Sequence, residues 1–158
     1  MCRRGYFADV APRIFDATQQ LVYSRCAAAA SSATLFDDVE VSLKVENASG
    51  SGSTGIRMSL RIHPAADMYA LHEGRYTGRM AISYFLFGRD GELKAEDWDR
   101  LEMALKPETY DQVLREGFPL KKELDLPEAM REALLRVVVY DIAEDRLGSV
   151  EAEIEANR

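Results

Sequence analysis

The sequence predicts a mainly β protein: an antiparallel, immunoglobulin-like or fibronectin-like β-sandwich with one helix before it and one short helix within it. Six to eight short runs alternate apolar and polar residues with a period of two, which is typical of half-buried strands. Turn-forming residues separate these runs at fairly regular intervals, and no long helical segments alternate with them as a doubly wound sheet would require. The 158 residues fit one domain. We divide it into an N-terminal strand remnant with a helix or linker (residues 1–36) and the β-sandwich (residues 37–158).

The first predicted element is a helix over residues 11–30. Its apolar residues recur at intervals of three and four, which places them on one helical face. Pro12 suits the first turn of a helix, and Asp9 can cap it. We expect this helix or linker to lie on the edge of the sandwich and to dock through its larger apolar residues, Ile14, Phe15, Leu21 and Val22.

Two strands joined by a loop are predicted next. Residues 37–46 read DDVEVSLKVE, and one face carries the apolar residues Val39, Val41, Leu43 and Val45. Residues 46–55, ENASGSGSTG, predict a flexible Gly/Ser loop. Residues 56–62 repeat the alternation and stop before Pro64, with the inward set Ile56, Met58, Leu60 and Ile62.

The middle of the chain is less regular. Residues 63–79 predict either an irregular loop or a short extended piece. A strand that begins at Met80 then leads into a tight turn at Arg89-Asp90-Gly91. The next segment, DRLEMALKP, alternates again, with the inward set Leu101, Met103 and Leu105.

The last third of the chain predicts a short helix and three extended segments. Pro107 opens the helix and Gly117 ends it. Residues 118–128 are extended, with Leu120, Leu124 and Leu126 inward. The chain ends in a β-hairpin with strands at residues 134–142 and 148–154 and a turn at 144–146. On its first strand, one face carries Val137 and Val139 and the other Val138 and Tyr140.

Charge and hydropathy limit the partners of the chain. Its net charge is −7, and the only dense basic cluster is Arg3-Arg4, so it lacks the basic stripe that nucleic-acid binding needs. No apolar run reaches the ~20 residues of a transmembrane helix. The N-terminus also lacks the apolar core of a signal peptide. We expect no nucleic-acid partner and no transmembrane segment, and a cytoplasmic location if the chain is complete.

The two histidines suggest one candidate metal site. Three side chains of types that can bind zinc lie close together in the sequence, namely His63, Asp67 and His72. A small metal-dependent hydrolase could use such a site. The spacing matches no established ligand pattern, however, so a pair of solvated histidines is the favoured interpretation. No serine or cysteine nucleophile has a supporting motif either.

A second candidate metal site lies in DIAEDRLG, where Asp141, Glu144 and Asp145 offer oxygens for calcium. A polar hairpin turn explains the same residues and is favoured. Cys2 and Cys26 match no zinc pattern and are interpreted as free thiols, although a bridge could form in an oxidising compartment. We therefore assign no catalytic, cofactor-binding or metal-ligating residue and expect no cofactor.

Short motifs follow one another along the chain: RRGYFA (residues 3–8), DGEL (90–93), Tyr110, Gly117, LDLPE (124–128), LLRVVVYD (134–141) and DRLGSVEAEIE (145–155). In this order they resemble bacterial proteins related to the von Willebrand factor A (VWFA) domain, common in Acidobacteria. There the A module is followed by a helix and a β-sandwich. Two departures exist: PEAMREA replaces the usual turn before the last hairpin, and the A module with its metal-binding Asp-x-Ser-x-Ser strand is absent.

The resemblance implies that the chain is the C-terminal sandwich of a larger exported protein, periplasmic or extracellular. RRGYFA would be the tail of the last strand of the preceding module, and no metal-site residue can be carried over. We expect a non-enzymatic structural or protein-interaction module that contacts its partner through residues 46–55 and 63–79. A carbohydrate-binding sandwich is a further alternative, for which Tyr69, Tyr76 and Trp98 are the aromatic candidates. Core packing is the default for Trp98.

Overall fold

The protein is mainly β, with two antiparallel sheets. The computed structural model describes residues 17–50, 53–127, 130 and 132–155. Its elements are α1 (Ala17–Ser31), β1 (Glu40–Gly50), β2 (Ser53–His63), the 3₁₀ helix η1 (Ala66–Met68), β3 (Ala70–His72), β4 (Arg75–Phe87), β5 (Leu93–Leu105), α2 (Pro107–Glu116), β6 (Phe118–Asp125), β7 (Glu132–Asp141) and β8 (Arg146–Glu155). The predictions for Cys2, RRGYFA, Ile14 and Phe15 concern residues outside the described ones.

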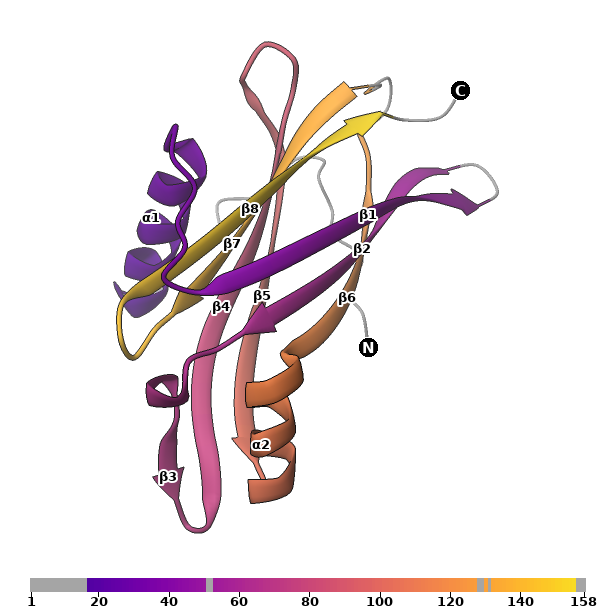
Figure 1. Ribbon diagram of the computed structural model, residues 1–158. Coiled ribbons are helices and arrows are strands. Elements are labelled where there is room, and N and C mark those ends of the chain that lie inside the picture. The colour runs from indigo at the N-terminus through magenta and orange to yellow at the C-terminus, as the bar shows by residue number, and fades with distance from the viewer. Residues whose placement is uncertain (1–16, 51–52, 128–129, 131, 156–158) are drawn as a thin grey trace.

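The two sheets face one another, and the chain passes between them several times (Figure 1). The smaller sheet has the strand order β1-β2-β6. In the larger sheet β4 lies between β5 and β7, β8 follows β7, and the short β3 pairs with the beginning of β4. The connection from β5 to β6 contains α2, so this helix lies at one end of the molecule (Figure 1).

The main core lies between the sheets and follows the predicted alternation. All four inward residues predicted for 56–62 are buried. Opposite them, the larger sheet contributes the buried side chains Met80, Ile82, Tyr84 and Leu86 of β4 and Leu135, Val137 and Val139 of β7. Val39, directly before β1, is buried as well, and Val41, Leu43 and Val45 of β1 are half-buried against this core. The period-two prediction is therefore confirmed for these strands.

Helix α1 covers the outer face of the larger sheet and not its edge (Figure 1). Its buried residues are small, namely Cys26, Ala29 and Ala30, and they lie against Phe85, Val138 and other residues of β4 and β7. The prediction that Leu21 docks the helix is wrong, because this side chain is 58% exposed. Small side chains let the helix approach the large side chains of the sheet closely. Leu21 does not lie on the face of the helix that carries Val22 and Cys26 and that contacts the sheet.

Two segments predicted to be loops are more regular than expected. Strands β1 and β2 stay paired up to Gly50 and Ser53, so most of residues 46–55 continue the strands. Residues 63–79 contain η1, β3 and the beginning of β4. The turn between β3 and β4 consists of Glu73 and Gly74, which both have positive φ (49° and 76°). Positive φ at both central residues is typical of a tight hairpin turn, but Glu-Gly is not among its usual sequences.

The remaining predictions hold closely. Pro107 occupies the start of α2, and Gly117 ends it with a φ of 80°. The terminal hairpin forms from β7 and β8, with Val137 and Val139 in the core between the sheets and Val138 and Tyr140 under α1. Strand β5 begins at Leu93, earlier than the sequence pattern indicated.

Replacing Val139 by alanine should lower the free energy of unfolding by about 1–3 kcal/mol, because the fully buried side chain leaves a cavity that its neighbours only partly fill. Urea unfolding measures this. Leu71→Ala serves as the control, since Leu71 is 66% exposed and its removal should leave the midpoint nearly unchanged. An unchanged midpoint for Val139→Ala would contradict the placement of β7 in the core.

Candidate functional site

The most exposed large apolar side chain among the described residues lies at the β3–β4 end of the molecule. Leu71 is 66% exposed. It lies directly opposite Tyr76 in the pairing of β3 with β4, so the two side chains share one face of the hairpin. This end of the protein is therefore the first candidate for a contact surface.

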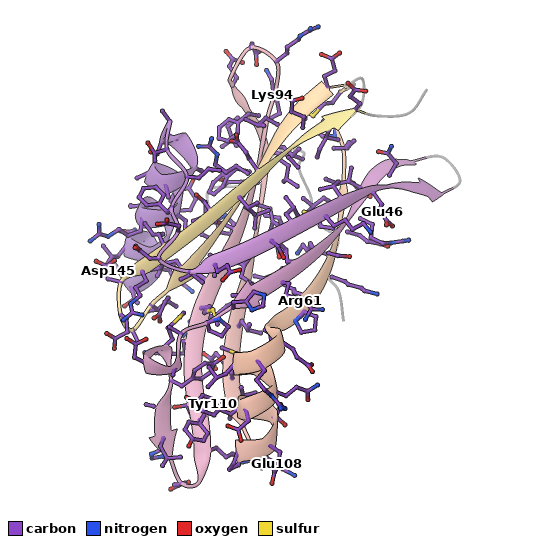
Figure 2. All side chains as sticks on the ribbon, viewed as in Figure 1. Glu46, Arg61, Lys94, Glu108, Tyr110 and Asp145 are labelled. Carbon is purple, nitrogen blue, oxygen red and sulfur yellow. The ribbon has the colours of Figure 1, made fainter. Side chains whose placement is uncertain are left out.

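Three tyrosines form a cluster beside Leu71. The rings of Tyr76 and Tyr110 stack in parallel with their centroids 3.7 Å apart. Tyr69 meets Tyr110 edge to face, at a centroid distance of 5.2 Å. Figure 2 shows Tyr110 at the end of the molecule that α2 and the β3–β4 hairpin form. We call Tyr69, Tyr76 and Tyr110 the tyrosine cluster.

Helix α2 and η1 hold the tyrosine cluster in place. Tyr110 lies one turn before the buried Val113, so both side chains fall on the same helical face. The Tyr110 hydroxyl donates a hydrogen bond to the carbonyl oxygen of Ala66 in η1 at 3.5 Å. Burial raises the pKa of Tyr69 to about 12. The cluster thus closes the end of the core and leaves Leu71 projecting beyond it.

An ion pair fixes η1 to the terminal hairpin. Arg146, at the beginning of β8, donates from Nη1 to Asp67 Oδ1 at 2.8 Å and from Nη2 to the other carboxylate oxygen. The hydrogen bonds from Arg146 hold the pKa of Asp67 below its ordinary value. A hollow of about 660 Å³ opens beside this pair, lined among others by Met68, Tyr69, Met103 and Glu144.

The structure does not bring the candidate zinc ligands His63, Asp67 and His72 together. The carboxylate of Asp67 is engaged by Arg146. His72 is exposed, and its Nε2 lies 3.9 Å from the carboxylate of its neighbour Glu73. His63 lies beside Gly117, at the end of α2. Within the residues described, no group of three or more histidine, cysteine or acidic side chains is arranged to hold a metal ion.

Two of the candidate calcium ligands, Asp141 and Asp145, also have different partners. Asp145 accepts hydrogen bonds from the Tyr140 hydroxyl at 2.8 Å and from Arg25 of α1 at 3.1 Å. Asp141 is fully buried, and its Oδ1 accepts the backbone N–H of Ala143 at 3.1 Å. Burial raises the pKa of Asp141. Figure 2 shows Asp145 at the tip of the β7–β8 hairpin, where its contacts are those of a structured turn.

We expect calcium and zinc to leave the melting temperature unchanged when either is added in modest excess over the protein. A metal bound tightly by the native state would stabilise it by mass action, and the described residues include no group of three or more histidine, cysteine or acidic side chains arranged to hold one. Thermal unfolding with added metal, compared with a sample containing a chelator, measures the effect. A rise of several degrees with either ion would contradict the expectation.

The three aromatic candidates for carbohydrate binding do not lie on one surface. Trp98 packs under α1, 5.1 Å from the Tyr23 ring and 5.7 Å from Phe85 between ring centroids, which supports its default assignment to packing. Tyr69 and Tyr76 do come together, but with Tyr110, which was not among the aromatic candidates. The sequence did offer a signal for Tyr110, because this residue lies one turn before the apolar Val113 in the helix that begins at Pro107.

A polar cluster between the sheets was also missed. Lys122 of β6 lies 2.9 Å from Asp97 Oδ2 and 3.1 Å from Asp99 Oδ1, measured from Nζ. Tyr84 donates a hydrogen bond to Asp99 at 2.9 Å, and its ring centroid is 5.1 Å from Nζ. Burial lowers the pKa of Lys122, but the two carboxylates outweigh this effect and raise it above its ordinary value. Lys122 lies on the same inward-facing side of β6 as Leu120 and Leu124. Its place in this alternating pattern could have indicated from the sequence that its side chain points inward.

None of the described helices is long and apolar enough to cross a membrane. Comparison with known proteins finds no family model that matches the chain and no match among curated proteins.

Proposed function

We propose that the chain is a non-catalytic protein-interaction module with a fibronectin-like or immunoglobulin-like β-sandwich fold. The strand order supports this fold. With the short β3 set aside, the seven long strands fall into a three-stranded sheet, β1-β2-β6, and a four-stranded one, β5-β4-β7-β8. Hairpins join β1 to β2, β4 to β5 and β7 to β8, and the other three connections cross from one sheet to the other, as in the Greek-key connections of such sandwiches.

The exposure of Leu71 carries the functional part of the proposal. Two thirds of this large apolar side chain remains in water, so a partner that covered it would gain free energy by burying it. It adjoins the tyrosine cluster, and tyrosine is enriched in protein interfaces. The turn and the short β3 place this surface on one end of the sandwich, where such modules carry their binding loops. The partner is another protein or an adjacent module of a longer chain.

We further propose that the module belongs to a larger exported protein related to the VWFA family, on the basis of the motif order from RRGYFA to DRLGSVEAEIE. The reading frame upstream of the codon for Met1 tests this directly. An A module encoded in frame, ending at RRGYFA, is the expected result. A stop codon directly upstream together with a ribosome-binding site would contradict the proposal.

Site-specific photo-crosslinking tests the contact surface. A photoreactive amino acid is placed at position 71 of the natural full-length protein in its source cells, and cross-linked products are identified by mass spectrometry. Leu93, 46% exposed at the opposite hairpin, is the matched control position. We expect one defined polypeptide or module to be captured at position 71 and not at position 93. Equal capture at both positions, or none at 71, would overturn the assignment of the surface.

A further inference from the structure

Asp141 is a buried carboxyl group of which one oxygen has no hydrogen-bond partner. It is the last residue of β7, and its side chain is fully buried. Its Oδ1 accepts the backbone N–H of Ala143 at 3.1 Å, whereas Oδ2 has no partner among the described residues. A charged carboxylate in such a place loses its hydration without compensation, while the acid form carries no charge. The surroundings of Asp141 therefore favour the acid form.

The arginine opposite Asp141 binds a different carboxylate. Arg146 faces Asp141 directly in the pairing of β7 with β8, so the two side chains leave the same face of the hairpin with Cβ atoms about 5 Å apart. The guanidinium group nevertheless donates to Asp67 of η1, from Nη1 at 2.8 Å and also from Nη2. The Asp67 side chain is 62% exposed. An arginine beside a buried carboxyl group thus pairs with an exposed one, which is the expected arrangement when Asp141 carries no charge.

The groups around Asp141 shift its pKa in both directions, and burial has the largest effect. Burial raises the pKa of Asp141, the backbone N–H groups of the following turn lower it, the Glu144 carboxylate raises it and Arg146 lowers it, with a net rise. On η1, the titratable group that interacts with Asp141 is Tyr69, whose own pKa is raised by its burial and also by Asp141. On β4, the residue paired with Asp141 is the apolar Met80.

We propose that Arg146 changes partner from Asp67 to Asp141 when Asp141 ionises, so that η1 is held at low pH and released as the pH rises. While Asp141 is an acid, Arg146 ties η1 to the tip of the terminal hairpin, beside which η1 lies (Figure 1). Loss of the proton to solvent creates a buried charge opposite Arg146. An unpaired buried charge is far more costly than a broken exposed pair, so the guanidinium group turns to Asp141. No covalent bond changes.

The two carboxyl groups set the pH range of this exchange. Arg146 holds the pKa of Asp67 below its ordinary value, so the pair that holds η1 is lost only when the pH falls through that lowered value. The pKa of Asp141 is raised, so its acid form survives above the ordinary pKa of aspartate and disappears as the pH rises through the native-state value. The contribution of Asp141 to stability is therefore largest at acid pH and declines as the pH rises.

Release of η1 would reach the tyrosine cluster. Ala66 of η1 accepts the hydrogen bond from the Tyr110 hydroxyl at 3.5 Å, and Tyr69 follows η1 directly. The ion pair of Arg146 therefore helps to hold two of the three rings. The exchange does not depend on the proposed interaction function, because no partner takes part in it.

NMR spectroscopy of the whole chain, with a chelator present, follows the exchange between about pH 4 and about pH 8. We expect the carboxyl carbon of Asp141 to titrate above the ordinary range of aspartate. The backbone amide signals of Met68 and Tyr69, which donate hydrogen bonds within η1, should move with the same midpoint. A carboxyl group that titrates in or below the ordinary range, or η1 signals that do not follow it, would overturn the proposal.

Two variants separate a change of partner from a local effect of the Asp141 charge, once circular dichroism has shown that both are folded. In Asp141→Asn, which imitates the neutral acid, the η1 signals should lose this midpoint. In Asp67→Asn, Arg146 has no competing partner, so Asp141 should titrate at a lower pH than in the parent. Asp125→Asn, at an exposed position that ends β6 in the other sheet, is the control and should change neither midpoint. An Asp141 midpoint that Asp67→Asn leaves unchanged would contradict the change of partner.

Discussion

Replacing Gly148 by alanine is expected to lower the free energy of unfolding by more than about 3 kcal/mol, at the upper end of what a single added methyl group costs in a packed protein. A Cβ atom at this position would overlap the carbonyl oxygen of Val39 and lie 2.9 Å from both the carbonyl carbon and the Cβ of Val39. The obstruction is backbone, which cannot turn aside as the end of a flexible side chain can.

The backbone at Gly148 is where the chain enters the sandwich from α1. Residues 36–39 run along the outer edge of β8 before β1 continues into the other sheet (Figure 1). Ser149 N–H donates to the Phe36 carbonyl at 2.9 Å, and Val39 N–H donates to the Leu147 carbonyl at 3.3 Å. Separating the two backbones to admit a methyl group would break these hydrogen bonds and the contact of α1 with its sheet.

Urea unfolding of Gly148→Ala against the parent checks this prediction. Gly74→Ala is a suitable control, because its added methyl group meets no atom within 4 Å and only its positive φ is unfavourable. We expect the control to lose about 1 kcal/mol. If Gly148→Ala loses no more than the control, residues 36–39 do not lie against β8 as described.

The strands between residues 37 and 155 could be predicted because their faces experience different surroundings. Alternation in 37–46 or 56–62 reflects one face in the core, and a period of two is visible without knowledge of the partner strand. The buried face of an element cannot be predicted from its own sequence where burial depends on residues far away in the chain. α1 is an example: its buried residues are small, and their burial follows from the large side chains of β4 and β7 that they meet.

The polar and aromatic contacts were not predictable for a related reason. Lys122 and Asp97 are 25 residues apart in the chain (122 − 97), on strands of different sheets, and no local pattern reports such a pairing. The tyrosine cluster likewise combines a hairpin and a helix. By contrast, the terminal hairpin brings together neighbouring residues, and its predicted faces are confirmed.

Arg136→Ala should be the second most damaging substitution, with an expected loss of about 2–4 kcal/mol in the free energy of unfolding. Arg136 lies on β7 and is buried under the C-terminal end of α1. Its Nη1 donates to the carbonyl oxygens of Ala30, at 2.9 Å, and of Ser32. Its Nε donates to Glu151 of β8 at 3.2 Å. Alanine would leave all three acceptors without this donor.

The position of Arg136 explains why the loss should be large. The last carbonyl groups of a helix have no partners within the helix, and a cation placed there also interacts favourably with the helix dipole. Arg136 therefore links the end of α1 to two strands of the larger sheet. Arg57→Ala is the matched control, because Arg57 forms a similar ion pair with Glu123 at 2.9 Å but in solvent. Exposed pairs contribute little, so this variant should unfold at nearly the parental urea concentration.

A double-mutant cycle with Glu151→Gln separates the two roles of Arg136. If the arginine acts mainly on the helix end, Arg136→Ala should remain strongly destabilising in the Glu151→Gln background. If it serves mainly the ion pair, the second substitution should add little to the first. We expect the former result, because two of its three acceptors are backbone carbonyls at the end of α1. Equal stability of Arg136→Ala and Arg57→Ala would show that Arg136 is not needed to hold α1 to the sheet.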